Sequence, residues 1–204
     1  MTSDKRLRVN TEKLGDIRDI IQYLQVLEKA YNHLYVFDFI ISDAKLRHKK
    51  LNESSWGTSK PVRTIPSIRK PEEVVLPDDR IQLTSIVIES PGFWEFLGNI
   101  NPLEVIRKYL CDRHERKKDE AYRNQHEKER GELENENLRT QIVRDKVKVL
   151  KELGVPEEKI RKALFEHIIK PLGELDAIQD KGLVVDAEII GGDSSDHSDD
   201  SREF

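Results

Sequence analysis

The sequence predicts a mostly helical α+β protein, in which a small sheet of two or more strands accompanies a long charged helix. Three observations predict this class: a helical repeat of apolar residues over 17–34, strand-like alternation near 81–88 and 183–189, and a charged stretch without a strong stop between 101 and 153. Hydrophobic and charged residues each make up 36% of the 204 residues, whereas globular chains typically have about 45–50% and about 25%. We therefore expect a small core, with much of the chain in water.

The N-terminal part is expected to hold the first helix. Residues 1–10 should be flexible, and residues 11–47 should be helical, with Thr11 as a plausible N-cap. Apolar residues then recur in steps of three and four, which places them on one helix face: Ile17, Ile20, Leu24, Leu27, Tyr31 and Leu34. Residues 48–79 contain four of the eight prolines. Because proline fixes φ and lacks a backbone donor, this segment is predicted to be a linker.

The linker is locally basic, since residues 45–70 hold eight Lys or Arg and one acid, Glu53. We interpret it first as solvated chain, or as a partner for the acidic C-terminal tail. The alternative is an anionic-surface binder for nucleic acid or acidic lipid. Its contacts would be Lys45, Arg47, Lys49, Lys50, Arg63, Arg69 and Lys70. The net charge of −4 argues against bulk attraction to nucleic acid, so this alternative is less favoured.

Residues 80–190 are expected to combine the sheet with the remaining helices. The alternation over 80–89 predicts a strand, and a change of parity within it indicates burial on both faces or a bulge near Ser85. Ser90-Pro91-Gly92 ends this strand, and Pro91 would suit the first turn of a short helix.

The long helix is expected to begin at Asn101-Pro102-Leu103-Glu104, which is a capping-box arrangement. No strong stop follows before Gly154. About 52 helical residues would measure roughly 78 Å at 1.5 Å per residue. Such a helix projects from the protein or breaks, with Gly131 as the best place for a break.

After it we expect a short helix over 156–169, ended by Pro171, and a second strand over 183–190. Residues 191–204 contain five acids and one arginine among serines, so they are predicted to be a disordered acidic tail.

A dense apolar cluster follows the first predicted strand. It reads first as a core plug or a subunit interface and second as an anchor for a partner groove. A membrane-surface segment is the least favoured interpretation, because such a helix normally carries Lys or Arg on its polar face and this segment has none. Together with a second apolar face late in the long helix, the predicted interface residues are Phe93, Trp94, Phe96, Leu97, Ile100, Ile142, Val143 and Leu150.

No catalytic or metal-binding motif is visible. The single cysteine, Cys111, reads as an ordinary helix thiol, and it fits a reducing cytoplasm. The segment from His126 to Arg130 begins like the zinc motif HExxH but has arginine at the second histidine. The histidines are dispersed along the chain: His33, His48, His114, His126, His167 and His197. We therefore expect no enzyme, metal, cofactor or small-molecule substrate. Without an apolar span or a hydrophobic N-terminal signal, we expect a cytoplasmic protein.

The segment ESPGFWEFLGNINPLE (89–104) and its continuation YLCDRHERKKD (109–119) resemble a group of uncharacterised bacterial proteins. In those proteins a strand ends in Ser-Pro, and an apolar segment and a long charged helix follow. The helix start LGVPEEKI (153–160) and the stretch beginning Tyr31-Asn32 are also similar, so the likeness covers about two thirds of the chain. The resemblance implies a bacterial cytoplasmic setting and no particular activity.

These observations favour a non-enzymatic assembly or adaptor protein that acts through helix-mediated contacts. Because two strands alone make a marginal sheet, they need the N-terminal helix as cover or strands from another copy. We therefore predict a homo-oligomer, with a further protein partner as an additional expectation.

Overall fold

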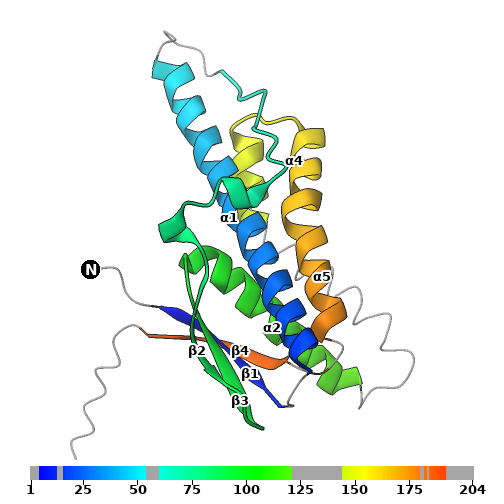
Figure 1. The fold of residues 1–204 in the computed structure, drawn as a ribbon. Helices are drawn as coiled ribbons and strands as arrows, with labels where there is room; N and C mark the ends of the chain where they lie inside the picture. Colours follow the sequence, from blue (N-terminus) through cyan, green and yellow to red (C-terminus); the bar gives the residue numbers. More distant parts are fainter. Residues whose placement is uncertain are drawn as a thin grey trace, which may run out of the picture.

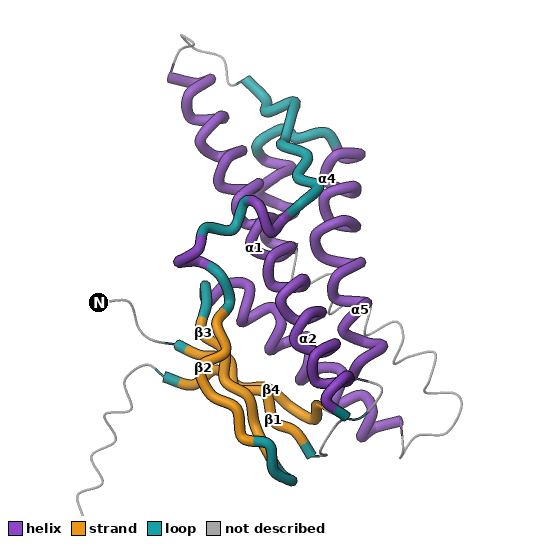
Figure 2. Tube along the Cα trace, in the orientation of Figure 1, coloured by secondary structure: helices purple, strands orange, loops and turns teal. Residues whose placement is uncertain are grey.

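The structure, a computed structural model, describes residues 5–12, 16–53, 60–120, 144–179, 182 and 184–191. Helices and a four-stranded sheet form two layers (Figures 1 and 2). In chain order the elements are β1 (Arg6–Thr11), α1 (Ile17–Glu53), the short 3₁₀ turns η1 (Pro71–Glu73) and η2 (Pro77–Asp79), β2 (Gln82–Val87), β3 (Gly92–Leu97), α2 (Ile100–Glu120), a helical segment at 144–152, α4 (Glu157–Leu164), the π-helical turn η4 (Phe165–Ile169), α5 (Lys170–Gln179) and β4 (Val184–Ile190).

The strand order is β2-β3-β1-β4, and every neighbouring pair is antiparallel. One helix connects β1 to β2, and β3 connects to β4 through helices. This succession with this strand order is the split β-α-β, or ferredoxin-like, topology, here with extra helices between α2 and β4. The predicted α+β class is confirmed, and the sheet is completed within one chain.

Two of the four strands lie where the sequence predicted something else. Residues 6–10, expected to be flexible, form most of the central strand β1, so that prediction is wrong. Leu7 and Val9 face the core while Arg6 and Arg8 face outward, and β3 and β4 supply the backbone partners. Because these partner strands are far away in the sequence, the local sequence pattern does not predict β1.

The apolar cluster after the first predicted strand forms β3 rather than a short helix. It follows a tight turn at Gly92, where a Cβ would lie 2.4 Å from the carbonyl oxygen of Val87. The alternation of Trp94 and Phe96 inward with Phe93 and Leu97 outward is a strand pattern.

Helix α1 has 37 residues and would measure about 56 Å, which is longer than the sheet beneath it. Its helical apolar repeat is confirmed from Ile20 onward, whereas Ile17 is 71% exposed. The predicted start with Thr11 as N-cap is wrong, because Thr11 ends β1, and the helix runs from Ile17 through Glu53, beyond the predicted end at residue 47. Tyr23, in its first half, packs against Trp94 of β3 with ring centroids 5.2 Å apart. Farther along, Lys29 reaches Glu174 of α5, so the same helix joins the sheet to the C-terminal helices (Figure 1).

A single very long helix is not confirmed. Helix α2 begins at Ile100, close to the predicted start, although Asn99 rather than Asn101 supplies the capping oxygen, 3.2 Å from the amide of Asn101. The described part of α2 ends at Glu120. The proposed break at Gly131 lies outside the described residues.

The helical segment 144–152 ends as predicted at Gly154, whose φ is +77°. The amide of Gly154 bonds the carbonyl of Lys151, and the amide of Val155 bonds that of Leu150, which is the Schellman pattern. The chain segment at Pro61 lies directly against this glycine, because a Cβ on Gly154 would approach the Cβ of Pro61 to 2.4 Å.

The predicted end of the C-terminal helix at Pro171 is wrong, because α4, η4 and α5 run on continuously to Gln179. In the π turn the amide of Lys170 bonds the carbonyl of Phe165, five residues back. This wider turn directly precedes Pro171, so it relieves the clash and the lost hydrogen bond that proline brings to an α-helix. In the described part of the chain, no helix is long and apolar enough to cross a membrane.

Candidate interaction surface

The sheet face away from the helices carries a charged centre. The Nε and Nη2 atoms of Arg8 donate to Oε1 of Glu95 at 3.1 and 2.7 Å, and Arg6 lies 3.6 Å from Oε2. Glu188 approaches Arg8 from the other side at 3.7 Å, and the Arg8 guanidinium lies 4.6 Å from the centre of the Phe93 ring. Only 7% of Glu95 is exposed. These contacts tie β1 to β3 and β4, and their charges largely compensate one another.

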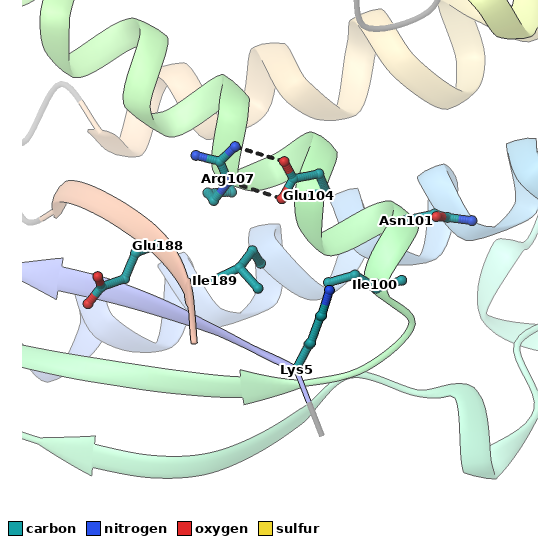
Figure 3. A pocket seen from close by; sticks show the side chains of 7 residues that line it. All are labelled: Lys5, Ile100, Asn101, Glu104, Arg107, Glu188 and Ile189. Carbon is teal, nitrogen blue, oxygen red and sulfur yellow. Dashed lines mark hydrogen bonds and ion pairs between the residues drawn. The ribbon is translucent and has the colours of Figure 1, made fainter. Parts of the chain in front are cut away.

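A cavity of about 590 Å³ opens beside the start of α2 (Figure 3). Its lining residues are Lys5, Ile100, Asn101, Glu104, Arg107, Glu188 and Ile189. Arg107 donates to both carboxylate oxygens of Glu104, at 2.7 and 3.0 Å, and this hydrogen bonding lowers the pKa of that carboxyl. The charges of Arg107 and Glu104 therefore compensate each other, and Lys5 and Glu188 add one base and one acid, so the cavity offers a mixed surface rather than an anion site.

The single cysteine of the chain, Cys111, lies on α2. Its Sγ donates to the carbonyl of Ala187 at 2.9 Å and lies 3.2 Å from the Asp186 carboxylate. Burial, followed by the hydrogen bond to Asp186, raises the pKa of the thiol to about 11. Because the thiolate is the reactive form, Cys111 is not an activated nucleophile in this setting.

The basic residues of the alternative site fall into two groups. Lys45, Arg47, Lys49 and Lys50 lie on the last turns of α1, and Arg63, Arg69 and Lys70 lie on the irregular segment after residue 60. Several have acidic partners, since Asp43 binds Arg47 at 2.7 Å, Glu53 lies 3.7 Å from Lys49, and Glu73 binds Lys70 at 2.7 Å. These pairs reduce the positive charge available to an anionic surface.

The predicted interface residues are placed differently from one another. Trp94, Phe96 and Leu150 are buried in the core of the single chain. Phe93 and Leu97 are half-buried on the open sheet face, and Ile100 is exposed at the rim of the cavity. Ile142 and Val143 lie outside the described residues.

The most exposed apolar surface of the sheet is the edge strand β2, which was not among the predicted interface residues. Leu83 and Ile86 are 45% and 40% exposed, and Ile88, just after the strand, is 57% exposed. Within the described ranges, β2 pairs with β3 on one side and with no strand on the other. The strand contains no charged residue, although edge strands are commonly protected by charges.

A bulge sets the direction of these side chains. The register shifts between Leu83 and Ser85, so the predicted irregularity near Ser85 is confirmed. Leu83 lies opposite Phe96, and Ile86 opposite Trp94, both of which face the helical layer. The bulge therefore places Leu83 and Ile86 on one face although they are three positions apart. The change of parity in the sequence was the available signal for this surface.

Comparisons with protein-family models, with curated proteins and with solved structures return no match for this chain. The geometry of the chain itself is therefore the basis for a functional proposal.

Proposed function

We propose that this protein is a non-enzymatic assembly module that joins copies of itself through strand β2. The supporting observation is an uncharged edge strand that exposes Leu83 and Ile86 on the same face. An unpaired strand edge offers backbone donors and acceptors to another chain, and symmetric dimers are the commonest assemblies. The proposal keeps the homo-oligomer expected from the sequence but moves the contact from the helices to the sheet edge.

Charge complementarity favours a second copy as the occupant. If two β2 strands pair antiparallel about a two-fold axis between Thr84 and Ser85, Leu83 of one copy lies opposite Ile86 of the other. The same register places Arg80, just before the strand, opposite Glu89, just after it. It also matches faces, since Leu83 and Ile86 both point toward the helical side. One register therefore places the apolar groups and the charged groups of the two copies opposite one another.

The size of the contact indicates a dimer that depends on concentration. Full burial of a Leu or Ile side chain contributes about 1.5–3 kcal/mol, so covering the remaining exposed parts of four such side chains contributes about 4 kcal/mol. Pairing of the two β2 strands joins both sheets into one sheet of eight strands and adds backbone hydrogen bonds, at about 0.5–1.5 kcal/mol each. Association costs at least about 4 kcal/mol of translational and rotational freedom. The surplus is modest, so the dimer should dissociate on dilution.

Light scattering coupled to size-exclusion chromatography tests the proposal. The wild type should approach twice the chain mass at high concentration, and Ile86→Lys should be monomeric, because it places a charge at the centre of the contact. Leu46→Lys is the matched control, since Leu46 is 60% exposed on α1, away from β2, and this variant should still dimerise. A wild type that is monomeric at every concentration would overturn the proposal, as would equal masses for Ile86→Lys and the wild type.

A charge exchange tests the register. Arg80→Glu and Glu89→Arg should each weaken the dimer, because each places like charges opposite one another twice. The double variant should recover dimerisation by restoring the opposite charges. A double variant weaker than both single variants would contradict this register.

A further inference from the structure

Two histidines that are far apart in the sequence meet between the helices. His33 lies in α1 and His167 in the π turn η4, 134 residues later. Their Nδ1 atoms are 3.2 Å apart, and their ring centroids are 5.3 Å apart with the planes inclined by 42°. His167 is only 2% exposed, whereas His33 is half-buried, so the pair is reached from the side of α1.

The π turn gives His167 an unusual position. Phe165 and Ile169 of the same turn are 57% and 46% exposed, while the polar His167 is buried beside Ile168. Packing alone favours the reverse arrangement, with the apolar side chains inside. Single π turns within helices are frequent at functional sites. The turn therefore directs an imidazole, rather than a hydrophobic group, at His33.

Burial disfavours the protonated form of both rings. Burial, with smaller contributions from His167 and Lys29, lowers the pKa of His33 to about 4, although Glu174 and Glu72 act in the opposite direction. Burial also lowers the pKa of His167, opposed by Glu166. Lys29 is itself paired with Glu174 at 2.6 Å. Because the two Nδ1 atoms share one hydrogen bond, one of them accepts through its lone pair, and neutral imidazole is the form that binds metals.

We propose that His33 and His167 bind one divalent transition-metal ion, of the Zn²⁺ or Cu²⁺ class, through their two Nδ1 atoms. In tetrahedral zinc, bonds of about 2.0–2.1 Å separate two nitrogen ligands by about 3.3 Å. The observed separation of 3.2 Å matches this distance, and each ring must turn so that its Nδ1 lone pair points to the ion instead of along the hydrogen bond to the other ring. The Nδ1 proton that the two rings share in the metal-free pair moves to Nε2 of its own ring, so neither imidazole gains or loses a proton.

Solvent would supply the remaining ligands from the side of the half-buried His33. Among the side chains that the structure describes, no three His, Cys, Asp or Glu residues gather into a metal-binding group. Imidazole ligands favour zinc and copper over magnesium and calcium, which take oxygen ligands. A bound ion would link the middle of α1 to the continuous helix of α4, η4 and α5.

Calorimetric titration of the full chain with Zn²⁺, and electron paramagnetic resonance of the Cu²⁺ form, test this site. The wild type should bind one ion with at least tenfold higher affinity than His33→Gln or His167→Gln, and the copper spectrum should show two imidazole nitrogens. His114→Gln, on α2, is the matched control and should bind like the wild type. Mg²⁺ should not compete.

Equal zinc affinity in the wild type and in His33→Gln would overturn the site, as would a copper spectrum without two imidazole nitrogens. Circular dichroism checks the fold of each variant. If His167→Gln does not fold, the half-exposed His33→Gln decides the question alone. The monomeric variant Ile86→Lys should retain zinc binding, so this inference fails or succeeds independently of the proposed assembly.

Discussion

The ion pair on the open sheet face predicts unequal effects for its two partners. Replacing Arg8 by alanine leaves the Glu95 carboxylate, which is 9% exposed, with only the longer 3.6 Å contact to Arg6. Replacing Glu95 by alanine leaves the Arg8 side chain, which is 34% exposed and can turn toward water or Glu188. The uncompensated charge is therefore buried in the first variant and accessible in the second.

The magnitudes follow from this difference in exposure. Removing one partner of a buried pair costs about 3–5 kcal/mol, and Arg6 offsets part of that cost, so Arg8→Ala should lose about 3 kcal/mol of unfolding free energy. Glu95→Ala loses hydrogen bonds to a charged group, for which about 1.5 kcal/mol is expected. The double variant should cost less than the two single variants added together, since the side chains are in direct contact.

Urea unfolding followed by circular dichroism measures these free energies. Arg69→Ala, which removes an exposed arginine outside the sheet, is the control and should change stability by less than about 0.5 kcal/mol. If Glu95→Ala were as costly as Arg8→Ala, or more costly, the explanation by unequal burial would be refuted. Strict additivity in the double variant would refute the pairing itself.

Three further predictions concern the helical layer. Gly154→Ala should lower the free energy of unfolding by about 2 kcal/mol or more, because φ is +77° and the new Cβ would meet Pro61. Gly173→Ala, which has open space around it, should instead raise this free energy by about 0.5–1 kcal/mol in the same urea assay. Tyr31→Phe should cost about 1–3 kcal/mol in thermal unfolding, because its hydroxyl accepts one backbone hydrogen bond and donates another, both at 2.7 Å. The pKa of His33 is lowered to about 4 from an ordinary 6.5, so as the pH falls the unfolded chain binds the proton before the folded protein does. The free energy of unfolding should therefore decrease between about pH 6.5 and pH 4. His33→Gln should make the urea midpoint depend less on pH in this range, and an unchanged dependence would contradict the prediction.

Local patterns determined a large part of this fold. The apolar repeat of α1 and the alternation in β2 and β4 follow from the periods of helix and strand, which act over a few residues. The stop at Gly154 was equally visible, because a glycine at positive φ satisfies the carbonyls at a helix end.

Other elements needed partners that lie far away in the chain. The segment Arg6–Thr11 is too short and too charged to be recognised alone, and it becomes a central strand because β3 and β4 bond to both of its edges. Pro171 is a helix breaker in any local reading, but the π turn before it lets the helix continue.

The sequence by itself determined the α+β class, the first helix, and the irregularity that exposes Leu83 and Ile86. Only the tertiary structure decided which strand became the edge of the sheet, and that the dispersed His33 and His167 face each other at 3.2 Å. The physical reason is the sequence distance over which each interaction acts. Backbone preference and side-chain periodicity act between near neighbours in the sequence, whereas the order of the strands and the contact between two helices depend on how the whole core packs.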